Sequence, residues 1–261
     1  MAFAKKDFLW AVHTFRLCPY YPWEILTKDG RMRRYNRLNE RMAFQVDMSS
    51  RELGMKIPDG WDAADKIQLW EVLVERPYFV EGFEPSHVVI DIGAKYGEFG
   101  VLSSLNPAVS KVYSFEPLPL NFKKMAELIR VNGGRVDAFP VALGDVEGIK
   151  SGSAEGEMFS VLGIGNRVEV KTKTLDSYHF EDIGLMKIDV EGMEMNVLKG
   201  SIETIRKFLP RIIIEVHSSD LKAQVDDFLS NLGYKRIVEG KIRKGTSLGT
   251  DIAQNVFYSH P

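Results

Sequence analysis

The sequence is poor in cysteine, because Cys18 is the only one among its 261 residues. A single cysteine excludes an intramolecular disulfide framework and a zinc site built from several thiolates. Cys18 also has no activating partner nearby in the sequence, so we expect an inert thiol. Long apolar runs are missing as well, and no stretch approaches the roughly 18 residues that a membrane-spanning helix needs.

Neither a signal peptide nor a strong charge bias is present. The apolar stretch near the amino terminus is interrupted and is followed by His13 and Arg16, without the core and cleavage site of a signal peptide. The net charge of −2 gives no general reason for a nucleic-acid or anionic-membrane partner. We therefore expect a cytoplasmic protein without membrane association. The sequence leaves open whether it forms a homo-oligomer.

The composition is 44% hydrophobic and 27% charged, which is typical of a globular protein with a sizeable core. Residues 1–85 and 86–261 differ in their patterns. We interpret 1–85 as an N-terminal extension of helices and turns that caps the substrate, and 86–261 as a cofactor-binding domain.

Within the extension, apolar residues from Phe8 to Phe15 recur at helical spacing and predict a first helix. Turns are predicted at Pro19, Pro22 and Asp29-Gly30. A second helix is predicted from Asp62, its N-cap, to about Arg76, before Pro77. The apolar positions expected to form its buried stripe are Ile67, Trp70, Leu73 and Val74.

From residue 86 onward, short apolar strands alternate with helical stretches. The predicted strands are 87–93, 111–117, 135–143, 185–192, 210–217, 234–240 and 251–260, and the predicted helices are 96–105, 118–131, 193–200 and 221–232. The stretch 144–175 predicts a hairpin or an exposed loop. Alternation of this kind indicates an α/β fold with a mainly parallel sheet covered on both faces. The last two strands, joined without a helix, are expected to be antiparallel.

A ligand site is predicted where the strands end, because open α/β sheets bind ligands outside the carboxyl ends of their strands. Asp91 closes one strand and is followed by Gly93 and Gly97, and Glu116 closes the next. A dinucleotide site uses the pattern G-x-G-x-x-G to hold a pyrophosphate, whereas Gly93 and Gly97 follow the pattern G-x-x-x-G. A carboxylate at Asp91 would repel a pyrophosphate but suits the ammonium and sulfonium of S-adenosylmethionine. Packing alone could also account for such a glycine turn.

Four segments together resemble the FkbM family of class I methyltransferases: VVIDIGAKYGEFG at 88–100, FEPLPLNF at 115–122, VALGD at 141–145 and LMKIDVEGMEMNVLKGS at 185–201. The resemblance spans about residues 86–217. It implies a Rossmann-like sheet of seven strands, S-adenosylmethionine as the cofactor, and methylation of a hydroxyl on a sugar, glycan or secondary metabolite.

The resemblance also implies which residues bind the cofactor. They are Asp91, Gly93, Ala94, Tyr96 and Gly97 at the methionine end, Glu116 and Pro117 at the ribose, and Leu143 and Asp145 near the adenine. Lys95-Tyr96 departs from the family pattern, which commonly has Asn and a small or aliphatic residue there. For Asp145, a role as a turn residue is an equal alternative.

Candidate catalytic residues follow the fourth and fifth strands. A hydroxyl acceptor needs a general base or a metal ion to remove its proton, and the candidates are Asp189, Glu191 and His217, with Glu215 beside them. Asp189 is the first choice, and capping of the next helix is its alternative. His217 could be a base near neutral pH or a hydrogen-bonded structural histidine. These side chains could also hold a divalent cation, but we expect no obligatory metal.

Other functions remain open at this stage. An RNA methyltransferase could use the arginines of the extension, which are Arg31, Arg33, Arg34, Arg37 and Arg41. A basic stripe leading to the Asp91 rim would favour it, whereas a solvated helix face is the other interpretation. A non-catalytic cofactor-binding protein is the third hypothesis. The favoured prediction is a small-molecule or glycan O-methyltransferase.

Overall fold

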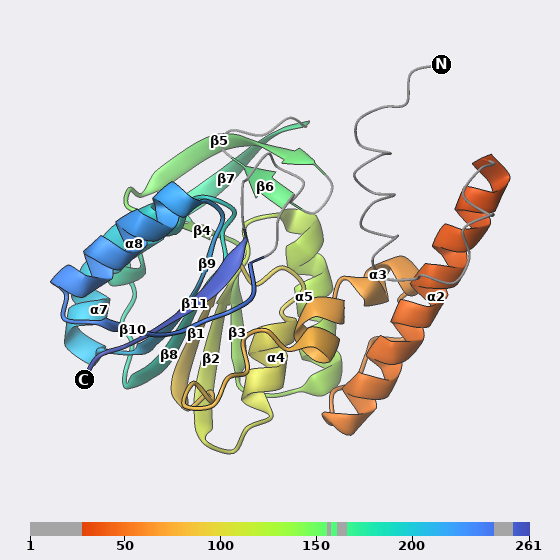
Figure 1. The fold of residues 1–261 in the computed structure, drawn as a ribbon, viewed down its shortest axis with the longest axis horizontal. Coiled ribbons are helices and arrows are strands. Elements are labelled where there is room, and N and C mark those ends of the chain that lie inside the picture. Colours follow the sequence, from red (N-terminus) through yellow and green to blue (C-terminus); the bar gives the residue numbers. More distant parts are fainter. Residues whose placement is uncertain (1–27, 156–157, 161–165, 243–252) are drawn as a thin grey trace.

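The computed structural model describes residues 28–155, 158–160, 166–242 and 253–261 (Figure 1). The helical elements are α2 (Lys28–Glu52), α3 (Ala63–Ile67), η2 (Glu71–Glu75), α4 (Glu98–Ser104), α5 (Pro119–Asn132), η3 (Leu175–Ser177), α6 (Glu194–Lys199), α7 (Ile202–Phe208) and α8 (Ser219–Asn231). The strands are β1 (His87–Ile92), β2 (Val109–Phe115), β3 (Val136–Phe139), β4 (Ala142–Leu143), β5 (Gly148–Glu155), β6 (Met158–Ser160), β7 (Asn166–Lys173), β8 (Ile183–Ile188), β9 (Arg211–Val216), β10 (Lys235–Glu239) and β11 (Gln254–Ser259).

A seven-stranded sheet in the order β10-β11-β9-β8-β1-β2-β3 forms the centre of the molecule. The pairs β1–β2, β2–β3, β1–β8 and β8–β9 are parallel, and β11 runs antiparallel to both of its neighbours. The predicted fold class, a mainly parallel Rossmann-like sheet with an antiparallel last strand, is confirmed. Strand order reverses between β1 and β8, where such sheets bind their ligands.

The strands are apolar on both faces because helices cover both faces (Figure 1). Neighbouring residues of one strand enter different cores: Ile90 packs with residues of α6, α7 and α8, whereas Val89 packs with residues of α4 and α5. This alternation is the period of two that a strand imposes on its side chains. The near-continuous apolar runs that predicted the strands therefore reflect burial from two sides.

The predicted third strand, 135–143, is divided by Pro140 into β3 and β4, which belong to different sheets. Proline has no N–H to donate, so it cannot continue a ladder. β4 pairs with β7 in a second sheet of order β4-β7-β5-β6, seen above the central sheet in Figure 1. The hairpin predicted in 144–175 is present as the antiparallel pair β5–β7. Helix α7 was not predicted.

The N-terminal part differs from the prediction in two respects. The turn predicted at Asp29-Gly30 is wrong, because both residues lie in α2, and the helix predicted around Phe8 lies outside the described residues. The helix predicted from Asp62 begins there, and Asp62 forms a capping box with Asp65. It then changes to a π-helical turn before Pro77, so the spacing of its inward positions is no longer that of an α-helix.

Of the predicted stripe, Leu73 is buried and Trp70 and Val74 are partly buried against the same core. The other two buried residues of this segment, Leu69 and Val72, were not predicted. Its apolar side chains share one core with Val46 of α2 and Phe99 of α4, so residues on both sides of position 85 pack together. Among the described helices, none is both long enough and apolar enough to cross a membrane.

Candidate functional site

A cavity opens at the carboxyl ends of β1, β2 and β8, at the point where strand order reverses. Its apolar lining comes from the ends of β1 and β2 and from β4 with the residue before it, and includes Ile92, Phe115, Val141 and Leu143. Acidic side chains outnumber basic ones in the rest of the lining, which includes Glu71, Glu98, Glu116, Asp189, Glu191 and Glu215 beside Lys95 and Lys187. Such a site suits a ligand with one apolar, flat part and one cationic part.

Gly93 brings the β1 and β8 loops together. Its φ is +73°, and a Cβ added there would lie 1.8 Å from the backbone oxygen of Asp189. Only glycine can fill that position, because it has no Cβ and adopts positive φ at low cost. Gly93 and the next residue, Ala94, line the cavity. The close approach of the two loops places Asp189 at the same rim.

Glu116 is held at the end of β2 by the backbone. Its Oε2 accepts a hydrogen bond from the amide of Lys95 at 2.9 Å, and its Oε1 accepts one from the amide of Leu118 at 2.9 Å. Burial raises the pKa of Glu116 to about 7. This carboxylate lines the cavity beside Pro117, and its orientation is fixed before any ligand arrives.

Asp91 is enclosed rather than exposed to the cavity. The side chain is 0% exposed, and Oδ1 lies 3.3 Å from Nζ of Lys187. Burial raises the pKa of Asp91, and the Lys187 ammonium opposes that rise. Lys187 also donates to the backbone oxygen of Gly93 at 2.8 Å. In this structure Asp91 acts on the site through Lys187 and offers a ligand no surface.

Three other predicted cofactor residues also lie outside the cavity lining. Tyr96 is buried edge-on against Trp61, with ring centroids 5.5 Å apart. Gly97 has φ +79° and packs against Met125, which a Cβ would approach to 2.6 Å. Asp145 accepts a hydrogen bond from Asn196 at 3.0 Å, which lowers its pKa. Gly93, Ala94, Glu116, Pro117 and Leu143 are the predicted cofactor residues that the structure brings to the cavity.

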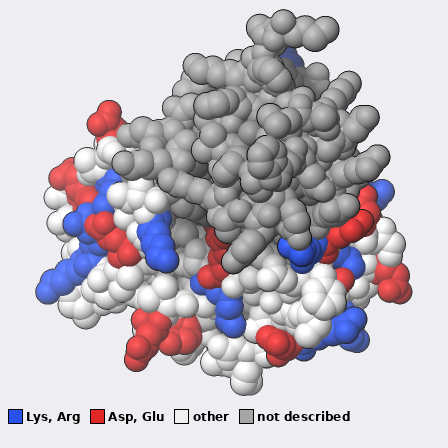
Figure 2. Space-filling view, turned by 45° about the vertical axis from the view of Figure 1, so that its right-hand side comes forward, with Lys and Arg blue, Asp and Glu red and all other residues white. Residues whose placement is uncertain are grey.

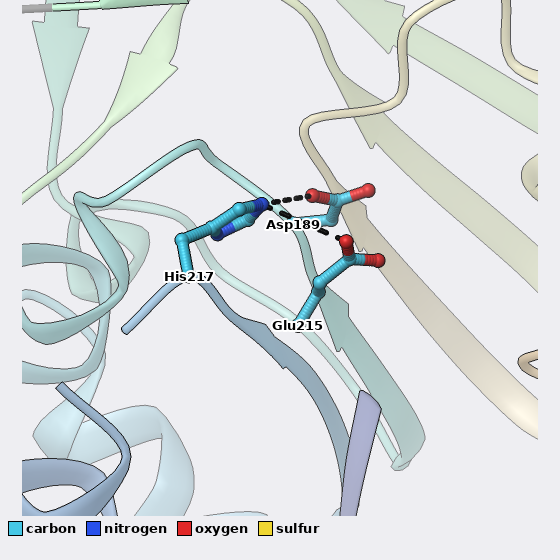
Figure 3. Close-up of side chains that lie close together, drawn as sticks. All are labelled: Asp189, Glu215 and His217. Carbon is cyan, nitrogen blue, oxygen red and sulfur yellow. Dashed lines mark ion pairs between the residues drawn. The ribbon is translucent and has the colours of Figure 1, made fainter. Parts of the chain in front are cut away.

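The candidate catalytic side chains meet at the ends of β8 and β9, as expected for adjacent parallel strands. Nε2 of His217 lies 3.9 Å from Oδ1 of Asp189 and 3.6 Å from Oε1 of Glu215 (Figure 3). Glu191 lies 3.4 Å from the same nitrogen. Tyr78, from the N-terminal part, donates its hydroxyl to Oδ2 of Asp189 at 3.0 Å, and the same hydroxyl lies 3.3 Å from Oε2 of Glu215. Asp189 does not cap α6, whose N-cap is Met193.

His217 is a poor base in this environment. Burial alone would lower its pKa, but the hydrogen bond from Nδ1 to Glu194 at 2.8 Å and the nearby carboxylates raise the pKa to about 10. The imidazole is therefore protonated at neutral pH. Burial, followed by repulsion from Asp189, raises the pKa of Glu191, so Glu191 takes up a proton more readily than an ordinary carboxylate.

Asp189, Glu215 and His217 also have the composition of a metal site. One potential ligand atom from each residue lies within 4.8 Å of the others. The hydrogen bond from His217 to Glu194 resembles the carboxylate–histidine contact that orients histidine ligands. A divalent cation would have to displace the proton on His217.

Sequence patterns missed several residues of the site. Gln68, Glu71, Val72 and Tyr78 line the cavity from the N-terminal part, and no local pattern marks them. Lys95 and Glu98 line it from the glycine loop and the first turn of α4. A signal existed for Glu98, because it is the only acid among the mostly apolar residues of the predicted helix 96–105.

Comparisons with known proteins agree with this geometry. A family model described as the methyltransferase FkbM domain matches residues 91–236. The 31-O-demethyl-FK506 methyltransferase FkbM of Streptomyces tacrolimicus is 28% identical over 193 residues, covering 58% of this chain and 74% of that protein. Methyltransferase 1 of Beauveria bassiana is 24% identical over 179 residues, covering 57% of this chain and 72% of that protein.

A solved structure supports the fold. The methyltransferase FkbM from Methylobacillus flagellatus KT superposes with a TM-score of 0.51 at 17% identity. The alignment covers 81% of this chain and 59% of that one, so the chain spans less than two thirds of that relative.

Proposed function

We propose a function on the premise that this chain belongs to the FkbM methyltransferase family. It transfers a methyl group from S-adenosylmethionine to a hydroxyl of a small molecule or glycan. The observation that carries the proposal is the acid-rich cavity at the switch point of the sheet, between β1 and β8. The name of the Streptomyces relative, a 31-O-demethyl-FK506 methyltransferase, supports the choice of a hydroxyl.

The residues present suit S-adenosylmethionine. The apolar wall that includes Phe115 and Leu143 would hold the adenine, and Glu116 would accept the ribose hydroxyls. The surrounding carboxylates favour a ligand that carries positive charge. Glu98 lines the same cavity, and its buried Oε2 accepts no hydrogen bond within the described chain, so the protein itself leaves one acceptor of the site unsatisfied.

S-adenosylmethionine supplies a methyl group on a positively charged sulfur. The chain's own residues must hold the acceptor hydroxyl in line and take its proton. Asp189 is the proposed proton acceptor, because it lines the cavity at the rim and its side chain is 24% exposed. Glu191, also in the lining and with a raised pKa, is the neighbouring acceptor. His217 contributes as a positive charge that lets the carboxylates lie close together.

A nucleic-acid substrate is less well supported. The cavity is lined mainly by acids, which would repel the phosphates of RNA. Lys, Arg, Asp and Glu are interspersed over the described residues of the face in Figure 2. The arginines considered for RNA binding all lie in one helix, α2, and are Arg31, Arg33, Arg34, Arg37 and Arg41. A small acceptor, neutral or cationic, agrees best with the lining.

Calorimetry with S-adenosylhomocysteine tests the cofactor, with NAD⁺ as the matched pyrophosphate nucleotide. We expect S-adenosylhomocysteine to bind and NAD⁺ to give no heat. The absence of S-adenosylhomocysteine binding, or preferential binding of NAD⁺, would refute the proposal. A non-catalytic protein would bind the cofactor but transfer no labelled methyl group to any compound in a panel of hydroxylated sugars and secondary metabolites.

The Asp189→Asn variant tests the chemical step. Turnover should fall about a hundredfold or more, since the proton acceptor is lost, while S-adenosylhomocysteine affinity should change little. Equal losses of turnover and affinity would contradict a role in proton removal. Turnover is measured on protein that has been dialysed against a chelator, because we expect activity without an obligatory metal. Activity that returns only with added Mg²⁺ would instead assign Asp189, Glu215 and His217 to metal binding.

A further inference from the structure

The glycine loop carries two ionisable side chains to which neither the family resemblance nor the proposed chemistry assigns a role. Lys95 lies between Gly93 and Gly97, and Glu98 is the first residue of α4. Both line the cavity. They have opposite charges and lie on the same side of the site as Gly93 and Ala94.

Glu98 is buried, and one oxygen of its carboxylate lacks a donor among the described residues. The residue is 5% exposed, and its Oε2 accepts no hydrogen bond from the described part of the chain. Burial raises the pKa of Glu98 to about 7. Burying a carboxylate oxygen without a partner is costly, and native sites that keep such an atom usually have a reason for it. Because Glu98 lines the cavity, the missing donor is expected to belong to a ligand.

Lys95 is held in place from two directions. Its backbone amide donates to Glu116, and its Nζ donates to Oε1 of Gln68 at 2.7 Å. An ammonium has three donors, and Gln68 accepts one of them. The lysine is therefore anchored at both ends of its side chain, with a cationic group oriented beside the cavity.

We propose that Lys95 and Glu98 bind the amino-acid part of the cofactor, Lys95 its carboxylate and Glu98 its ammonium. This inference rests on the proposed function. An α-amino acid presents both charges on one carbon, so it requires two opposite charges close together on the protein. Asp91, the other acid of this loop, is enclosed with Lys187 and cannot reach a ligand. A sulfonium has no N–H, so it cannot satisfy the acceptor on Glu98.

The test compares two nucleosides that differ in the group concerned. S-adenosylhomocysteine carries the amino-acid part, whereas 5′-methylthioadenosine keeps the adenosine and the thioether but lacks the amino-acid part. Glu98→Gln and Lys95→Met, each in the full chain, should lower the calorimetric affinity for S-adenosylhomocysteine by at least about tenfold. Affinity for 5′-methylthioadenosine should stay within about twofold of the parent value.

Glu203→Gln and Lys111→Met are the matched controls. They remove the same charges from surface ion pairs with Arg206 and Asp137, away from the cavity. Both should keep the two affinities of the parent protein. The controls separate a local contact from a general change in the charge of the molecule.

The outcomes distinguish this inference from the function on which it rests. Equal losses for both nucleosides in Glu98→Gln and Lys95→Met would indicate a structural role and overturn the pairing, as would unchanged binding of S-adenosylhomocysteine. A parent protein that binds both nucleosides with the same affinity would overturn the pairing alone. A parent protein that binds neither would overturn the proposed function as well.

Discussion

The imidazole of His217 supplies charge at a rim crowded with carboxylates. Its Nδ1 bonds to Glu194, whose side chain is fully buried, and its Nε2 faces Asp189, Glu191 and Glu215. Like charges this close repel one another unless a proton or a cation lies between them. A protonated His217 fills that role, so the residue that the sequence suggested as a base is better understood as a counter-charge.

The pH dependence of stability tests this role. The pKa of His217 in the folded protein is about 10, above its ordinary value of 6.5, so its stabilising effect is complete below pH 6.5 and is lost as the pH rises toward 10. The free energy of unfolding of the parent protein should fall over that window by a few kcal/mol, on the order expected for such a shift. In His217→Gln this part of the decline should be missing. Urea unfolding measured from pH 6 to pH 10 provides the comparison.

His87 provides the control, because it is an exposed histidine paired with Asp182 at the start of β1. His87→Gln should keep the decline seen in the parent protein. If His217→Gln and the parent protein gave parallel curves, the histidine would not be charged in the folded state.

At the level of single residues, sequence reasoning predicted the positions that follow directly from strand ends. Glu116, Asp189 and Glu191 reached the cavity because the carboxyl ends of parallel strands meet at one edge. Asp91 occupies the expected strand end, but its side chain is enclosed by Lys187. Whether a side chain at a strand end points outward or is covered depends on its neighbours across the sheet, which the order of residues does not reveal.

At the level of elements, the site depends on how closely the loops after β1 and β8 approach. Gly93→Ala would place a methyl group against the backbone of Asp189 in a residue with φ +73°. We expect it to lower the free energy of unfolding by about 3 kcal/mol or more and to weaken S-adenosylhomocysteine binding. Urea unfolding and calorimetry measure the two effects.

Gly54→Ala isolates the backbone contribution. Gly54 follows α2 with φ +73°, the same value as Gly93, and an added Cβ would meet nothing within 4 Å. This variant should cost only about 1 kcal/mol, the strain of a positive φ. Equal decreases in the free energy of unfolding of the two variants would mean that the loops after β1 and β8 can move apart without loss of stability. That result would contradict the contact described for Gly93.

Elements that combine an apolar run with a clear boundary were predicted within a few residues. β1, β8, β9 and α5 are of this kind, since burial on both faces or one regular helical stripe produced a strong local pattern. The segment around Pro140 and the π-helical turn at Glu71–Glu75 were not predicted correctly. At Pro140 one residue ends the ladder of β3, and the strand that β4 then pairs with, β7, is distant in the sequence.

At the level of the whole molecule, Tyr78 links the N-terminal part to the rim. Its hydroxyl has one proton, which it donates to Asp189 while lying beside Glu215. Tyr78→Phe should lower turnover about tenfold by leaving Asp189 less well oriented, with little change in S-adenosylhomocysteine affinity. Kinetics on the identified acceptor and calorimetry measure the two effects.

Tyr234→Phe is a suitable control, because its hydroxyl donates to the backbone of Pro210 at 2.9 Å and does not line the cavity. That variant should keep the parent turnover. If Tyr78→Phe also did so, the N-terminal part would cover the site without orienting Asp189.

β11 follows β10 along the chain but lies between β9 and β10 in the sheet. During synthesis β10 is made before β11, the strand with which it pairs. Until β11 has been made, β10 and the outer edge of β9 therefore lack their hydrogen-bonding partner. Closure of the central sheet is therefore a late event, and until β11 has left the ribosome the nascent chain presents an open edge that a chaperone or a second nascent chain can occupy.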